Sequence, residues 1–292
     1  MPEGDTVYRT AHRLDQALAG QPLVLADLRW PELSTIDLVG RTTLEVVPRG
    51  KNILHRLSGG VTVHSHLRME GQWRIEHTAS LTARSLANLQ IRALLGAEAY
   101  TAVGLRLGDL HAVPTSAEHT LVGHLGPDVL GPGWDPAEAA RRLAASPTTI
   151  GAALLDQRNL AGVGTMYAAE SLFLERLPPW TPAAELAPTA VASLVERAHL
   201  LLDRGKEGAV QRTTGRGDRG EWHFVHGRSG RPCLRCGTTV RVAMIGDAPR
   251  ERTMFYCPSC QGGLGPTDDG RQQRPLGSGT AKPAKTAYRN RR

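Results

Sequence analysis

The chain has 292 residues, of which 40% are apolar but only 4% aromatic, so its cores are expected to consist mainly of aliphatic side chains. Thirty-five basic residues against 28 acidic ones give a net charge of +7, which favours a polyanionic partner, either nucleic acid or a membrane surface. No apolar run approaches the roughly 18 residues of a membrane span, and the first residues lack the pattern of a signal peptide, so we expect a cytoplasmic protein with no membrane partner.

The amino-terminal part is predicted to be one helix followed by short strands. Apolar residues spaced as on one helix face predict a helix over residues 5–19: Val7, Ala11, Leu14 and Leu18. Short runs rich in β-branched residues or leucine then follow, at residues 22–30, 42–47, 52–57, 61–67, 72–76, 90–95 and 100–107. This spacing predicts an antiparallel β-sandwich or barrel within residues 1–117.

From about residue 118 the composition changes to alanine, leucine and glutamate at helical spacing. Asp135 followed by Pro136 is typical of a helix start. The predicted helices cover residues 135–146, 149–157, 165–177 and 188–204. We therefore expect a helical domain over residues 118–221, whose polar, glycine-rich end at 206–221 is predicted to be a flexible linker.

Four cysteines form two C-x2-C pairs separated by 20 residues: Cys233, Cys236, Cys257 and Cys260. This spacing is typical of a structural Zn²⁺ site, in which four thiolates close around one ion and leave no open position for a catalytic water. The alternative, two disulfides, requires an oxidising compartment, which the rest of the sequence does not suggest. We expect one Zn²⁺ in a small β-hairpin module over residues 222–262.

The start of the chain places an amine next to a carboxyl group. Removal of the initiating Met exposes the secondary amine of Pro2, and an α-amine with a pKa near 7.7 to 8 is partly neutral at pH 7. Glu3 stands beside it as a possible acid or base. His64 and His66 lie on one strand face, but no third ligand accompanies them, so we interpret both as structural.

Six segments, in this order, resemble the formamidopyrimidine-DNA glycosylase and endonuclease VIII family of base-excision repair enzymes. They are MPEG at the start, Gly50-Lys51, SHLRMEGQWR at 65–74, LGPDVL at 125–130, LLDQRNLAGVGTMYAAESLF at 154–173, and the final GRSGRPCLRCG with RTMFYCPSCQ. The resemblance covers the chain to Gln261. It implies an α+β protein with an amino-terminal β-sandwich, a central helix-two-turns-helix domain and a carboxy-terminal zinc-finger β-hairpin.

The resemblance also implies a mechanism. Pro2 is expected to attack C1′ of the damaged nucleotide, to expel the base and to form an imine with the opened sugar. Glu3 is expected to move protons, and Lys51 to act as a cation and proton donor near the lesion phosphate. β,δ-Elimination then follows, so the expected enzyme is both a DNA glycosylase and an abasic-site lyase. It is expected to act as a nucleoid-associated monomer on double-stranded DNA.

Further residues are expected to contact DNA. Such enzymes extrude the damaged nucleotide and fill the gap with a side chain, for which Met69 is the candidate. Gly162 and Gly164 are expected to expose amide N–H groups to a phosphate at a helix start, next to Thr165, where the family has Asn. Arg252 matches the arginine that the family places before its second cysteine pair.

Two departures bear on the substrate. The region LRLGDLHAVPTS lacks the Asp-Pro-Arg-Arg-Phe-Gly stretch of the formamidopyrimidine branch, which favours the endonuclease VIII branch and oxidised pyrimidines. Thr6 stands where the family often has glutamate. Two alternatives remain open, an abasic-site lyase with little glycosylase activity and a non-catalytic binder of damaged DNA.

The end of the chain, residues 263–292, holds seven basic and two acidic residues and no periodic apolar face. We expect a disordered basic tail. It either adds nonspecific DNA affinity, docks a repair or replication partner, or only aids solubility.

Overall fold

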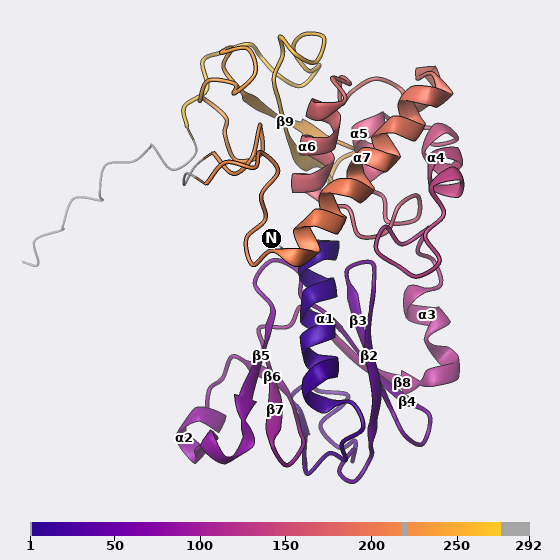
Figure 1. Ribbon diagram of the computed structural model, residues 1–292, viewed down its shortest axis with the longest axis vertical. Helices are drawn as coiled ribbons and strands as arrows, with labels where there is room; N and C mark the ends of the chain where they lie inside the picture. Colours follow the sequence, from indigo (N-terminus) through magenta and orange to yellow (C-terminus); the bar gives the residue numbers. More distant parts are fainter. Residues whose placement is uncertain (1, 218–220, 276–292) are drawn as a thin grey trace, which may run out of the picture.

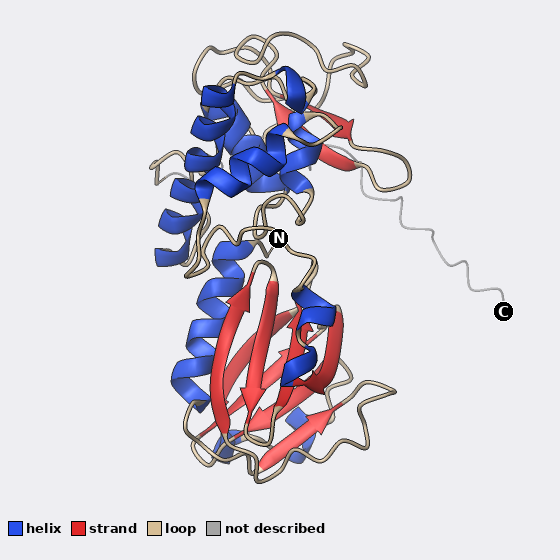
Figure 2. Ribbon diagram, turned by 90° about the vertical axis from the view of Figure 1, so that its right-hand side faces the viewer, coloured by secondary structure: helices blue, strands red, loops and turns tan. Residues whose placement is uncertain are grey.

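The computed structural model describes residues 2–217 and 221–275, which form two lobes joined at the amino-terminal end of the first helix (Figure 1). One lobe is a β-sandwich, and the other contains most of the helices and a small β-hairpin (Figure 2). The predicted fold class, a β-sandwich followed by helices and a cysteine-bearing hairpin, is confirmed.

The sandwich consists of two four-stranded antiparallel sheets. The first has the order β1 (Leu25–Leu28), β6 (Ile91–Gly96), β7 (Tyr100–Leu105) and β5 (Gln72–His77). The second has the order β2 (Thr43–Arg49), β3 (Asn52–Leu57), β4 (Val61–His66) and β8 (Asp109–Pro114). The chain crosses between the sheets in the long β1–β2 connection and in the turns β4–β5 and β7–β8.

Helix α1 (Gly4–Leu18) packs against strand β2 and buries the predicted apolar face in the core of the sandwich. Val7, Ala11 and Leu18 are completely buried, and Leu14 is almost so. The first turn of α1 extends beyond the sandwich toward the helical lobe (Figure 1). The fold therefore brings residues 2–4 to the junction between the lobes.

Five short elements in this part of the chain have no counterpart in the sequence prediction. They are strand β8, the four-residue helices α2 (Ala83–Leu86) and α3 (His119–Val122), and the 3-10 helices η1 (Thr78–Ser80) and η2 (Thr115–Ala117). Only Leu110 is buried in β8, so this strand lacks the alternation that reveals a half-buried strand. One helical turn is too short to display a period.

The second lobe is built from α4 (Pro136–Ala144), α5 (Ile150–Leu155), α6 (Thr165–Leu174) and α7 (Pro188–Glu207). Asp135 caps α4 as predicted, because its carboxylate accepts the N–H of Glu138 at 3.0 Å. Helix α6 is buried on all sides except at its last residue and forms the centre of the lobe.

The hairpin of β9 (Arg241–Ile245) and β10 (Arg252–Tyr256) shares the core of this lobe. Ile245, Met254 and Phe255 are buried in the same cluster as the side chains of α6. The cysteine module is therefore held against the helices, which fixes the direction in which its arginines point.

Two segments expected to be flexible are anchored in the structure. In the predicted linker, α7 continues to Glu207, and the side chain of Gln211 donates to Asp5 Oδ1 at 2.9 Å. Thr213 donates to the buried carboxylate of Glu170. The prediction of a flexible linker is therefore wrong for residues 206–213, because polar contacts to distant residues hold a segment that has no apolar period. Residues 214–217 form an irregular loop, and residues 218–220 lie outside the described chain.

The tail prediction is also wrong for residues 263–275, which pack on the hairpin. Asp268 accepts hydrogen bonds from the guanidinium of Arg241 and, at 2.6 Å, from the hydroxyl of Tyr256. The amide of Gln273 bonds both the N–H and the carbonyl of Val242 at 2.8 Å. Buried polar pairing, which an apolar pattern does not reveal, orders this segment; the prediction for 276–292 falls outside the described residues.

Among the residues that the structure describes, no helix combines the length and the apolar character needed to cross a membrane.

The buried His55 in β3 is expected to make the free energy of unfolding depend on pH. Its ring is buried, Nε2 lies 2.8 Å from the hydroxyl of Thr43, and burial lowers its pKa from 6.5 to about 4. The unfolded chain therefore binds this proton at a higher pH than the folded chain. We expect the free energy of unfolding to fall as the pH drops from about 6.5 to about 4, by up to about 3 kcal/mol for this residue.

Urea unfolding of wild type and His55→Gln at pH 7.5 and 4.5 measures this contribution. The variant is expected to lose less stability on acidification, although His64, whose pKa is also lowered to about 4, keeps part of the dependence. An identical loss in both proteins would contradict the assignment.

Candidate active site

Glu3 immediately precedes α1, and its carboxylate is completely buried against the start of helix α6 in the other lobe. It accepts the backbone N–H groups of Gly164 at 2.6 Å and Met166 at 2.8 Å. A further N–H, from Tyr167, lies at 3.4 Å. The amino end of a helix stabilises an anion, so α6 holds this carboxylate in one position.

The same contacts correct the prediction for the two glycines. The N–H of Gly164 is taken by Glu3, and the N–H of Gly162 donates to Gln157 Oε1 at 3.0 Å. Neither amide is free for a phosphate. The anion that this helix start binds is Glu3 itself, and the glycines serve close packing: the carbonyl of Gly162 accepts the N–H of Gly4 at 2.9 Å.

Gly164→Ala is expected to displace Glu3. A Cβ at residue 164 would lie 2.5 Å from Cδ of Glu3, inside van der Waals contact with a carboxylate that the surrounding backbone holds in place. We expect activity on DNA to fall about 100-fold or more, because a catalytic group displaced by about 1 Å loses its alignment.

Single-turnover cleavage of a damaged duplex, compared with Gly133→Ala as the control, measures this effect. Nothing lies within 4 Å of a Cβ at Gly133. Wild-type activity of Gly164→Ala would show that the position of Glu3 is not critical.

Lys51 follows the tip of the β2–β3 hairpin, which inserts into the junction between the lobes. Gly50 has a φ of +58°, and a Cβ there would lie 3.0 Å from Cβ of Ala161. The buried carboxylate of Asp128 accepts the N–H of Gly50 at 2.7 Å. Asp128, which belongs to the helical lobe, thus holds the turn that precedes Lys51. Lys51 lies between two strands, as predicted.

Burial and charge bring the proton affinities of Glu3 and Lys51 closer together. Burial raises the pKa of Glu3, while the nearby charge of Lys51 opposes this rise. Burial lowers the pKa of Lys51; the charge of Glu3 opposes this, and that of Arg252 adds to it. Buried groups with pKa values displaced by a charged partner are typical of catalytic sites.

Arg252, the first residue of β10, brings the cysteine module to this site. It is exposed, and its charge acts on Lys51 although the two residues are 201 positions apart. His66, at the end of β4, pairs in register with Asn52, and the charge of Lys51 also acts on its pKa. Lys51, Arg252 and His66 therefore form a basic region around the buried Glu3.

Three further predicted residues lie at the start of the chain, at the start of α6 and in the β4–β5 turn. Pro2 is half-buried and directly precedes Glu3, so its backbone is anchored one residue away. Thr165 is buried as the first residue of α6. Met69 lies in the β4–β5 turn with 67% of its surface exposed, which excludes a role as a core methionine.

Three buried carboxylates in the described chain escaped the sequence prediction. They are Asp5 in the first turn of α1, Asp128 in the LGPDVL segment and Glu170 in α6. Glu170 accepts the N–H groups of Phe224 and Val225 at 2.8 Å and of His226 at 2.9 Å, so it holds the loop that leads to the cysteine module. The sequence feature that could have identified Glu170 is a single acidic residue in an otherwise apolar helix.

His64 and His66 each have a polar partner within the protein, and Nδ1 of His66 accepts the backbone N–H of Arg68 at 3.0 Å. Nε2 of His64 lies 2.9 Å from Oδ1 of Asn52, and burial lowers the pKa of His64 to about 4. Within the described part of the chain, the one group of side chains placed to share a metal ion is that of the four cysteines.

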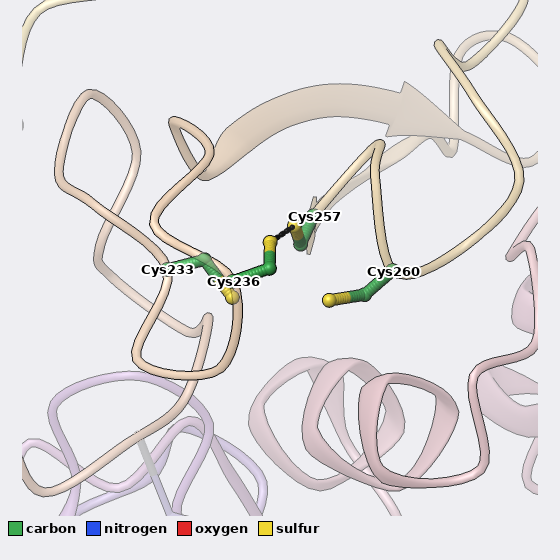
Figure 3. A group of neighbouring side chains, drawn as sticks. All are labelled: Cys233, Cys236, Cys257 and Cys260. Carbon is green, nitrogen blue, oxygen red and sulfur yellow. Dashed lines mark hydrogen bonds between the residues drawn. The ribbon is translucent and has the colours of Figure 1, made fainter.

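The four cysteine side chains converge between two turns, as Figure 3 shows. Their sulfur atoms all lie within 4.8 Å of one another, and Sγ of Cys236 is 3.5 Å from Sγ of Cys257. No disulfide links them. Two thiols from each turn, at these separations, fit the donor set of one tetrahedral ion, so the group is suited to bind a metal.

Known proteins resemble this chain over nearly its whole length. Residues 1–126 match the model of the formamidopyrimidine-DNA glycosylase N-terminal domain, and residues 125–214 match that of the formamidopyrimidine-DNA glycosylase H2TH domain. A probable endonuclease 8 2 of Streptomyces coelicolor is 51% identical and covers 93% of this chain and 98% of its own. The DNA-(apurinic or apyrimidinic site) lyase Nei2 of Mycolicibacterium smegmatis is 40% identical, covering 89% and 99%.

Solved structures resemble the fold. The MutM (Fpg) protein of Thermus thermophilus has a TM-score of 0.72 and 32% identity, covering 90% of this chain and all of its own. Lactococcus lactis formamidopyrimidine-DNA glycosylase, non-covalently bound to DNA containing an abasic site, has a TM-score of 0.74 at 22% identity, covering 89% and 99%. The second likeness concerns the fold alone.

Proposed function

Because this chain belongs to the formamidopyrimidine-DNA glycosylase and endonuclease 8 family, we propose that it is a bifunctional DNA glycosylase and abasic-site lyase of base-excision repair. The observation that carries the proposal is the convergence of Glu3, Lys51 and Arg252 from three separate segments beside the amino-terminal Pro2. A protein that only binds DNA needs no buried carboxyl and amine next to a free terminal amine.

The reaction begins with the secondary amine of Pro2, which attacks C1′ of the damaged nucleotide. The C1′–N bond breaks and the base leaves with a proton. Glu3, whose pKa is raised by burial, takes the proton that the Pro2 nitrogen loses on attack and delivers it to the ring oxygen as the sugar opens and the imine forms. The α6 amides hold Glu3 in place throughout.

Elimination follows from the imine. The imine acidifies the C2′ protons, and loss of one breaks the C3′–O bond and releases the 3′ phosphate. A second elimination at C5′ releases the other phosphate, and water then hydrolyses the imine to regenerate Pro2. Lys51 and Arg252 neutralise the flanking phosphates, and Lys51 supplies a proton to a leaving oxygen.

The partner is double-stranded DNA that carries a damaged base or an abasic site, bound by a monomer. Met69 enters the gap left by the extruded nucleotide, while Arg252 and the hydroxyl of Thr165 contact phosphates. An enzyme that repairs chromosomal DNA acts at the nucleoid in the cytoplasm, and we assign the protein to that location.

Oxidised pyrimidines are the proposed lesions. The absence of the Asp-Pro-Arg-Arg-Phe-Gly stretch supports this choice, as do the relatives named endonuclease 8 2. A panel of duplexes with oxidised pyrimidines, 8-oxoguanine paired with C, and formamidopyrimidine tests it. Fastest cleavage of 8-oxoguanine would overturn the assignment.

Borohydride trapping distinguishes the proposed bifunctional enzyme from the two alternatives, a lyase with little glycosylase activity and a non-catalytic DNA-binding protein. Untagged protein with Pro2 as its confirmed first residue is incubated with a duplex containing one abasic site, and borohydride is added to reduce the imine. We expect a covalent adduct. Its absence would leave a non-catalytic binder, whereas trapping without cleavage of any damaged-base duplex would leave a lyase with little glycosylase activity.

The four cysteines are proposed to hold one structural Zn²⁺, which would fix the module that carries Arg252. Cys257→Ala is expected to lower the bound metal from about one ion per chain to none. It is also expected to weaken binding to an abasic-site duplex more than 10-fold, because a structural ion contributes directly to folding of its module.

Ser259→Ala is the matched control, because Ser259 is exposed and lies between the same two cysteines. Metal content by elemental analysis and affinity by fluorescence anisotropy are measured on both variants. Metal retention and wild-type affinity in Cys257→Ala would contradict the zinc assignment.

A further inference from the structure

Two turns at one end of the sandwich share an unusual backbone. Arg68 in the β4–β5 turn has a φ of +50°, and Arg106 in the β7–β8 turn has a φ of +49°. Arg176 is the one other non-glycine residue with a positive φ in the described chain. Side-chain-bearing residues rarely adopt this conformation, and it persists where surrounding contacts enforce it, often at functional sites.

Ion pairs run crosswise between the two turns. Nε and Nη2 of Arg68 donate to the two carboxylate oxygens of Asp109, each at 3.0 Å. Nη1 of Arg106 donates to Oε2 of Glu70 at 3.1 Å. A Cβ at Gly108 would collide with the side chain of Arg68, so this glycine allows the arginine to lie across the opposite turn.

Stability of the fold does not account for this arrangement. Arg68 is 63% exposed and Glu70 71% exposed, and exposed ion pairs contribute little to the free energy of unfolding. The effect of the pairs is local. They join the side chains on both sides of Met69 to the opposite turn, whereas Met69, which is 67% exposed, carries no such tie.

The two turns lie at the end of the sandwich that carries Lys51. Strand register pairs His66 with Asn52, the residue after Lys51, and also with Asp109. The charges of Lys51, Asp109 and Arg68 all act on His66, so these groups are neighbours. The turn that carries Met69 therefore lies at the same end of the sandwich as Lys51 of the proposed site.

We propose that Arg68 and Asp109, with Arg106 and Glu70, are positioning residues that lock the two turns into one rigid base for Met69. This proposal rests on the proposed function, because it gives Met69 the duplex as its target. Methionine is flexible, and a mobile turn beneath it would have to be ordered each time DNA binds. The crossed ion pairs order the turn in advance.

The test uses Arg68→Asn, Asp109→Asn and the double variant. Asparagine tolerates a positive φ, so Arg68→Asn removes the ion pair without adding backbone strain. The probe is a duplex with a tetrahydrofuran abasic-site analogue opposite 2-aminopurine, whose fluorescence rises when a side chain disturbs its stacking. Arg141→Asn is the control, because Arg141 forms an equally exposed ion pair within α4.

Each single variant is expected to bind the probe about 5- to 10-fold more weakly and to show a smaller fluorescence rise. The double variant is expected to be no worse than either single variant, because both remove the same contact. Melting temperatures are expected to stay within about 2 °C of wild type.

Three results would overturn the proposal. Wild-type binding and fluorescence in both single variants would show that the ion pair does not position Met69. Tighter binding by Asp109→Asn would show that Arg68 is a DNA-contacting cation which Asp109 restrains. A wild-type protein that forms the borohydride adduct but gives no fluorescence rise would remove Met69 as the wedge, while the proposed lyase function would stand.

Discussion

Glu3→Gln is expected to lower the single-turnover rate of base removal by about 10²- to 10⁴-fold, the range typical of a lost general acid or base. Glutamine has nearly the same size but cannot give up or take up a proton near neutral pH. Its NH2 group would also face a backbone N–H of Gly164 or Met166, where Glu3 now presents oxygen. The rate is measured on a duplex with one oxidised pyrimidine, with enzyme in excess.

The matched control is Asp15→Asn. Asp15 lies farther along α1 and accepts the N–H of Val46 at 2.7 Å, so its substitution also converts a carboxylate that binds backbone into an amide. We expect this variant to cleave at nearly the wild-type rate. A Glu3→Gln variant that removes bases as fast as Asp15→Asn would exclude Glu3 from proton transfer.

Lys51→Gln is expected to reduce the single-turnover rate of strand cleavage by about 10²- to 10³-fold, because it removes both a cation near the phosphate and a proton donor. Lys51→Arg separates these roles. Arginine keeps its charge at all accessible pH values but does not release a proton. We expect Lys51→Arg to restore affinity for DNA while kcat stays close to that of Lys51→Gln.

The pH profile gives a second measurement on Lys51. Burial lowers the pKa of this amine, so the wild-type rate is expected to decline at a lower pH than an ordinary lysine would allow. The residual rate of Lys51→Arg is expected to lack this alkaline decline. Full activity in Lys51→Arg would show that Lys51 acts by charge alone.

Regular elements of the fold were predictable because their residues repeat a physical pattern. The face of α1 and the cysteine spacing are of this kind, and the structure confirms the helix and the convergence of the thiols. Strand β8 was missed because it buries Leu110 alone. The docked segment at 263–275 was missed because Asp268 and Gln273 hold it through polar contacts.

The candidate site was likewise predictable from the sequence only in part. Sequence motifs identified Pro2, Glu3, Lys51 and Arg252 as candidates but did not show that they are neighbours. The fold brings these residues together across the two lobes. The two glycines at the start of α6 show the limit of motif reasoning. Their sequence indicates a helix start suited to an anion, but not that the anion is the buried carboxylate of Glu3.

Peptide mapping of the borohydride adduct tests the central claim most directly. Untagged protein is trapped on an abasic-site duplex, digested with protease and nuclease, and analysed by tandem mass spectrometry to locate the residue that carries the sugar. The account predicts the modification on the nitrogen of Pro2, and loss of the adduct when the initiating Met is retained. A modification on Lys51, or trapping that persists with the terminal amine blocked, would contradict it.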